Sequence, residues 1–130
     1  LLDIVNVHDV GTLINPALAE AQVHGGMSMG IGLGLSEKLL FDPKTGRALN
    51  NNLLDYKLST FMDHPRLRAY FVENPEPTSA FGTKSLGEPP TCPVAPAIRN
   101  AVYQATGVAV NDAPVNPHIL FKRFKEEGLF

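Results

Sequence analysis

The sequence has few cysteines, no tryptophan and few charges. Cys92 is its single cysteine among 130 residues. One thiol cannot form an intrachain disulfide or a set of thiolate ligands, and the four histidines lack the spacing of a metal site, so no zinc or iron–sulfur site is expected. Cys92 is therefore predicted to be a small buried residue in a protein of a reducing compartment, with the cytoplasm as the expected location.

The balance of charge and hydropathy excludes several further classes. Eleven basic residues against thirteen acidic ones give a net charge of -2, and the basic residues are scattered apart from Lys122, Arg123 and Lys125 near the end, which argues against nucleic-acid binding. The apolar stretch 27–35 is interrupted by glycines and is too short to cross a bilayer. The N-terminal residues lack the basic region and cleavage site of a signal peptide. A chain of this length, 44% hydrophobic, is expected to fold as one domain over residues 1–130.

Hydrophobic periodicity and capping residues predict an α+β fold. Asn-Pro pairs, which combine a helix cap with a suitable first helical residue, stand at positions 15–16 and 116–117. We expect two main helices, at about 16–35 (or as far as Lys38) and 93–106, and a short helix at 117–126. They pack on a small, mostly antiparallel sheet formed by a strand at 2–7, a hairpin around 42–46 and a strand at 67–72.

Glycines recur every fourth residue in the first predicted helix, at Gly26, Gly30 and Gly34. Each costs about 1 kcal/mol relative to alanine in a helix interior. Such a row is expected only where another backbone or a cofactor comes very close.

Glu88 is the candidate catalytic residue. Residues 87–90 read Gly-Glu-Pro-Pro, so the glycine permits close approach of a ligand while the two prolines fix the backbone. A general base must stay within hydrogen-bond reach of the proton that it accepts, and a rigid loop favours this. A solvated glutamate in a proline-rich loop is the alternative that the residues alone leave open.

The order of motifs resembles the molybdenum subunit of the xanthine dehydrogenase family of hydroxylases. Besides Gly-Glu-Pro-Pro, the chain has His-Asp-Val-Gly at 8–11, Gln-Val-His-Gly-Gly at 22–26, Asp-Tyr-Lys at 55–57 and Asp-His-Pro at 63–65. These motifs are similar to those of the family in order and spacing, over almost the whole chain. Because family subunits are many times longer, the resemblance implies that the chain is a C-terminal fragment of a larger molybdopterin-binding domain.

The resemblance also implies roles for individual residues. Glu88 matches the general base beside the molybdenum, and Gln22 matches a glutamine that hydrogen-bonds the cofactor or an oxygen near the metal. Gly25 and Gly26 would let the cofactor come close. Further backbone or side-chain contacts are expected from Lys84, Ser85 and Gly87, and from Gly82.

The implied cofactor is molybdenum–molybdopterin, shared with segments outside this chain, with FAD and 2Fe-2S groups on other domains or subunits. The implied reaction hydroxylates a purine or another N-heterocycle with oxygen from water. The implied partners are the rest of the subunit and the FAD and iron–sulfur parts, and the fragment alone is expected to be inactive and to expose apolar surface through which it dimerises. Aldehyde, nicotinate and carbon monoxide oxidoreductases remain open, and so does a non-catalytic structural or assembly fragment.

Overall fold

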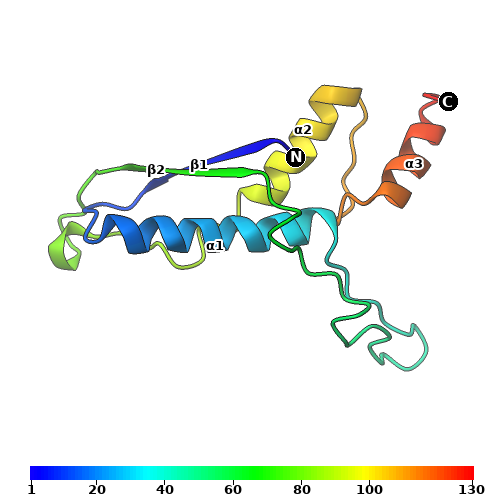
Figure 1. The fold of residues 1–130 in the computed structure, drawn as a ribbon, viewed down its shortest axis with the longest axis horizontal. Coiled ribbons are helices and arrows are strands. Elements are labelled where there is room, and N and C mark those ends of the chain that lie inside the picture. Colours follow the sequence, from blue (N-terminus) through cyan, green and yellow to red (C-terminus); the bar gives the residue numbers. More distant parts are fainter.

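Two strands and three α-helices form the chain, and this computed structural model describes all residues from 1 to 130 (Figure 1). The elements follow in the order β1 (Asp3–Asp9), α1 (Pro16–Leu35), β2 (Arg66–Val72), a 3-10 turn η1 (Ala80–Gly82), α2 (Val94–Thr106) and α3 (Pro117–Glu126). The α+β fold class, both strands and all three helices are confirmed as predicted, within one or two residues.

The helix boundaries follow from their capping residues. Asn15 Oδ1 accepts a hydrogen bond from the Leu18 amide at 3.1 Å, and Asn116 Oδ1 accepts one from the Ile119 amide at 3.0 Å. Each side chain thereby satisfies one of the amides that a helix N-terminus leaves unpaired. Gly107 ends α2 with a φ of 74°, the left-handed conformation that glycine adopts at low cost.

The sheet differs from the prediction. β1 and β2 pair in parallel, in a register from Asp3 opposite Arg66 to Asp9 opposite Val72, so the expected mostly antiparallel sheet is wrong. The connection between these strands contains α1, and a crossover through a helix is the usual way to join parallel neighbours. The predicted hairpin forms only one antiparallel bridge, between Phe41 and Ala48, and does not join the sheet.

α1 packs along one face of the two strands and against α2 (Figure 1). Val23, Met27 and Ile31 of α1 recur every fourth residue and form the larger of two core clusters together with Val94 and Ile98. The glycine row faces the start of α2. A Cβ added at Gly30 would lie 2.5 Å from Val94 Cβ and 3.0 Å from the Thr91 carbonyl oxygen, and one added at Gly34 would lie 2.9 Å from Ile98 Cδ1. Close approach of the α2 segment therefore accounts for these glycines.

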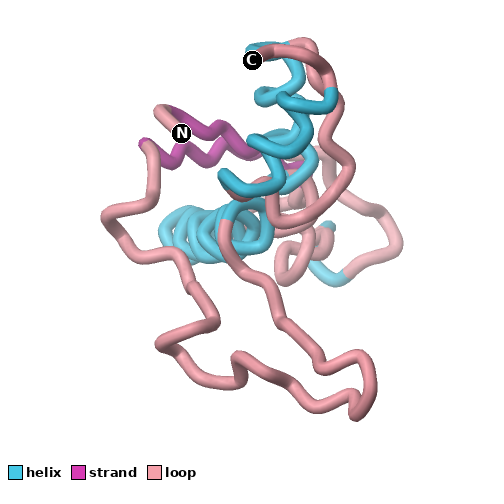
Figure 2. Tube along the Cα trace, turned by 90° about the vertical axis from the view of Figure 1, so that its right-hand side faces the viewer, coloured by secondary structure: helices cyan, strands magenta, loops and turns pink.

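Much apolar surface is left open, as predicted. The outer face of the sheet presents Val5, Val7, Tyr70 and Val72, each about half exposed. The segment between α1 and β2 projects away from the helices and strands (Figures 1 and 2) and exposes Leu53, Leu54, Phe61 and Met62. None of the helices is long and apolar enough to cross a membrane.

Candidate functional site

The fold brings Gln22 of α1 to the loop that carries Glu88. Gln22 Nε2 donates a hydrogen bond of 2.8 Å to the carbonyl oxygen of Gly87, although 65 residues separate them in the chain. Gln22, Gly87 and Glu88 are all exposed. Two of the residues predicted for the site, Gln22 and Gly87, are therefore in contact, and Glu88 directly follows Gly87 in the chain.

Glu88 belongs to a tight turn that leads into α2. Its carbonyl oxygen accepts a hydrogen bond of 3.0 Å from the Thr91 amide, while its side chain is exposed to solvent. Cys92 Sγ lies 3.9 Å from the same carbonyl oxygen. Cys92 is exposed, so the prediction that it is buried is wrong: it stands on the outer side of the turn, where the core does not reach.

Pro90 fixes the far side of this turn. Its carbonyl oxygen accepts a hydrogen bond of 3.0 Å from Asn6 Nδ2, and both residues are buried. The Pro90 ring lies over Gly26, where an added Cβ would be 2.5 Å from Pro90 Cβ. Gly26 thus makes room for Pro90, whereas its neighbour Gly25 has no heavy atom within 4 Å of an added Cβ and is open to a ligand.

The Lys84 side chain pairs with Asp9 at the end of β1. Its Nζ lies 2.6 Å from Asp9 Oδ2, and its backbone amide donates to the Val10 carbonyl oxygen at 2.9 Å. The hydrogen bond from Lys84, together with one from the Gly11 amide, lowers the pKa of the Asp9 carboxyl. Lys84 therefore ties the start of the loop to β1, and Ser85 beside it is exposed.

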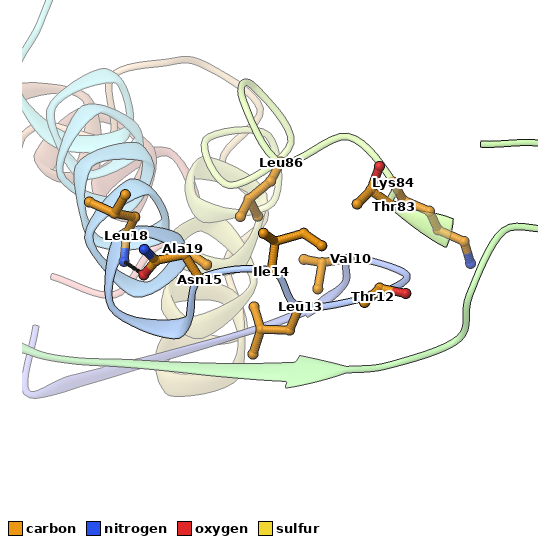
Figure 3. Close-up of a pocket in the computed structure, with 10 residues that line it drawn as sticks. All are labelled: Val10, Thr12, Leu13, Ile14, Asn15, Leu18, Ala19, Thr83, Lys84 and Leu86. Atoms are coloured by element: carbon orange, nitrogen blue, oxygen red, sulfur yellow. Dashed lines mark hydrogen bonds between the residues drawn. The ribbon is translucent and has the colours of Figure 1, made fainter. Parts of the chain in front are cut away.

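An apolar hollow of about 260 Å³ lies between the start of α1 and the residues that precede Glu88. Figure 3 shows Val10, Ile14 and Leu86 facing it, with Thr83 and Lys84 at its edge. Neither Gln22 nor Glu88 lines this hollow.

His8 is buried on the same face of β1 as Asn6, and its Nε2 has no hydrogen-bond partner. Burial lowers the pKa of His8 below its ordinary value of 6.5. The folded chain therefore holds a neutral imidazole in the strand that supports the Glu88 loop.

Lowering the pH below 6.5 is expected to destabilise the fold through His8. Below pH 6.5 the unfolded chain binds a proton at His8 more readily than the folded chain does, because the pKa of His8 is lower in the fold. The contribution of neutral His8 to stability is therefore present above pH 6.5 and is lost as the pH falls below it. Thermal midpoints measured from pH 8 to pH 5 check this, with His8→Gln as a variant that cannot titrate. The lowered pKa of Asp9 acts only below 3.8, outside this window. Equal pH slopes for both proteins would contradict the assignment.

The sequence model of the molybdopterin cofactor-binding domain family matches residues 1–65, which is half of the chain. The chain belongs to this family. It is 58% identical over 126 residues to the putative xanthine dehydrogenase molybdenum-binding subunit of Escherichia coli strain K12, covering 97% of this chain and 17% of that protein. It is 38% identical over 106 residues to the aldehyde oxidoreductase molybdenum-binding subunit of the same strain, covering 81% of this chain and 14% of that protein.

A solved structure shares the fold as well. Quinoline 2-oxidoreductase from Pseudomonas putida 86 superposes with a TM-score of 0.86 and 31% identity, over 96% of this chain and 16% of that one. The resemblance to molybdenum hydroxylase subunits that the sequence motifs indicated is thus confirmed. The chain spans about a sixth of the length of the relatives that it matches.

The residues around Glu88 fit a molybdopterin cofactor-binding domain. The exposed Gln22 amide has a second N–H and a carbonyl oxygen besides the N–H used by Gly87, so it can both donate to a ligand and accept from it. Gly25 and Gly87 leave free space beside Gln22 and Glu88. A polar cofactor could approach the backbone closely at both glycines.

Two buried polar residues of β1, Asn6 and His8, were not predicted from the sequence. Both occur in a strand otherwise rich in Ile and Val, and both are buried. Polar side chains at alternate positions of an apolar strand are the signal that could have found them, because a buried polar group needs a partner or a role.

Proposed function

We propose that this chain is the C-terminal part of a molybdenum hydroxylase subunit of the xanthine dehydrogenase type, with Glu88 as general base. The proposed reaction is the oxidative hydroxylation of a purine or another N-heterocycle with oxygen derived from water. The observation that carries the proposal is the hydrogen bond between Gln22 and Gly87, because it joins the two candidate motifs directly beside Glu88.

The chemistry asked of Glu88 is the removal of a proton from the attacking oxygen. An ionised carboxylate on a rigid mount suits this, because proton transfer requires the acceptor to be within hydrogen-bond distance. The Glu88 side chain is free to meet a substrate or cofactor, since it is exposed while its backbone is held in the turn. General base catalysis of this kind contributes about 10²- to 10⁴-fold to a rate.

Gln22, Gly25 and Gly87 would hold the cofactor on this side. The Gln22 amide orients a polar ligand without adding charge, and the two glycines let the ligand approach the backbone. When bound, the molybdenum cofactor supplies the redox centre that takes up the electrons of the oxidation. Lys84 and Ser85 would contribute at the rim, where Lys84 already pairs with Asp9.

The remaining parts of the assembly are proposed to be the rest of the molybdenum subunit and the FAD and 2Fe-2S domains or subunits, in the cytoplasm. The exposed outer face of the sheet supports this, because parallel sheets are normally covered on both faces. The small share of the relatives that this chain covers supports it too.

The subunit assembly that contains this chain is expected to reduce a dye when xanthine is added. Xanthine-dependent dye reduction, measured at a known molybdenum content, tests this, with benzaldehyde and nicotinate as parallel substrates. Turnover of xanthine above the other two supports the proposed substrate class. Turnover of the aldehyde alone would contradict it and favour the aldehyde alternative, for which the 38% identical relative is the supporting observation.

A structural or assembly role is the second candidate. Support comes from the glycine row, because a Cβ added at Gly26, Gly30 or Gly34 would lie within 3 Å of Pro90, Val94 or Ile98, so packing accounts for these glycines without a cofactor. That candidate requires the exposed side chains of Gln22 and Glu88 to be dispensable for turnover.

A further inference from the structure

The Glu88 turn, residues 87–91, has no regular secondary structure. Three of the four carbonyl oxygens of residues 87–90 nevertheless accept a hydrogen bond. Gln22 Nε2 donates to Gly87 O at 2.8 Å, the Thr91 amide donates to Glu88 O at 3.0 Å, and Asn6 Nδ2 donates to Pro90 O at 3.0 Å. The Thr91 contact lies within the turn itself. Gln22 and Asn6 therefore tie the turn to the rest of the fold, one on each side of Glu88.

The two ties differ in their surroundings. Gln22 is exposed, so water can compete with its hydrogen bond, whereas Asn6 is only 6% exposed and Pro90 is fully buried. Buried hydrogen bonds are stronger than exposed ones, and a buried carbonyl that loses its partner is costly. The Asn6 contact is therefore the firmer of the two.

Asn6 also occupies an unexpected place in β1. Val5 and Val7 point to the outer face of the strand, where they are 47% and 57% exposed, and the amide of Asn6 is buried on the opposite face. The buried amide fits beneath the turn because Pro90 presents its carbonyl oxygen to β1 and its ring to Gly26 of α1. Pro90 is thus fixed from two elements at once.

We infer that Asn6 is a positioning residue for Glu88. Its amide holds the Pro90 carbonyl in place, and the two prolines transmit this constraint to the backbone of Glu88, which sets the position of the Glu88 carboxylate. Each proline ring fixes its own φ, so few free rotations remain between Pro90 and Glu88. Displacement of the Pro90 carbonyl consequently moves the Glu88 backbone instead of being absorbed by the chain. This inference rests on the proposed general-base role of Glu88.

The test is steady-state kinetics of the assembled, cofactor-loaded enzyme with Asn6→Leu, which keeps the number and branching of the side-chain heavy atoms and removes the donor. The expected result is a fall in kcat of about 10- to 100-fold, since a misplacement of about 1 Å can cost 10²-fold, with KM changed less than about twofold. The acidic limb of the kcat profile, which reports the base, is expected to move as well.

Ile4→Ala is the matched control, because Ile4 lies on the same face of β1 two residues earlier and packs on the core. It is expected to lower the thermal midpoint while kcat per molybdenum and the acidic limb stay as in wild type. Equal losses of kcat in Asn6→Leu and Ile4→Ala would overturn the inference, since they would show a structural role only.

Asn6→Asp serves if Asn6→Leu does not fold. It is isosteric, but its ionised form repels the Pro90 oxygen, so kcat is expected to fall as the pH rises through the pKa of the new carboxyl. A wild-type pH profile would overturn the inference.

Glu88→Gln, assayed alongside, separates the role of Asn6 from the role of Glu88. If Glu88→Gln turns over normally, the proposed base is wrong and Asn6 has nothing to position; if it is inactive while Asn6→Leu resembles wild type, only the role of Asn6 fails.

Discussion

Glu88→Gln is expected to lower substrate turnover by about 10²- to 10⁴-fold while the molybdenum content stays unchanged. Glutamine keeps the size of the side chain and its hydrogen-bonding oxygen but cannot accept a proton at neutral pH. The exposed side chain makes no contact on which the fold depends, so the loss is expected in kcat and not in stability. Dye-reduction kinetics with metal analysis of the same samples measure both quantities.

Glu127→Gln is a suitable control for this substitution. Glu127 is exposed at the end of α3, remote in sequence from the Glu88 turn, and its removal changes the net charge by the same amount. Wild-type turnover in Glu88→Gln would rule out the general base and leave the structural or assembly role as the better account. Reduced turnover in both variants would point to the change of charge instead.

The helices could be predicted from the sequence because their ends are determined locally. Asn15 and Asn116 cap helices with their own side chains, each followed by proline at the first helical position, and Gly107 stops α2 by its backbone conformation. Each of these signals depends on residues within one turn. Such boundaries therefore do not require knowledge of the tertiary structure.

The sheet could not be predicted in the same way, because strand pairing is a long-range choice. β1 meets β2 after more than fifty intervening residues, and the local hairpin signal around Phe41 and Ala48 suggested an antiparallel sheet that does not form. The face of β1 that is buried is also set by tertiary contacts. Hydropathy favours burying Val5 and Val7, yet the structure buries Asn6 and His8.

In the candidate site, too, some features could be predicted from local sequence patterns and others depend on the tertiary structure. Glu88 and Gln22 were identified by their motifs, and their proximity through Gly87 is a property of the fold that no local pattern contains. Asn6 was missed because its role depends on the carbonyl of Pro90, 84 residues later. The residues proposed to meet a ligand can thus be recognised by resemblance, whereas the partner of Asn6, and with it the role that we infer for Asn6, is known only from the structure.

Gly30→Ala is expected to lower the free energy of unfolding by about 1–3 kcal/mol, the usual cost of overpacking a filled contact, despite the better helix propensity of alanine. Its methyl group would lie 2.5 Å from Val94 Cβ, so α1 and α2 must separate. Gly25→Ala, in the same helix, meets nothing within 4 Å and should gain up to about 1 kcal/mol. Thermal midpoints that move in opposite directions would confirm that packing against α2 requires glycine in this row, and midpoints that rise together would contradict it.

The same separation of α1 and α2 should also affect turnover, because α1 carries Gln22 and α2 follows the Glu88 turn. In Gly30→Ala the contact between Gln22 and Gly87 should weaken, and turnover should fall together with stability.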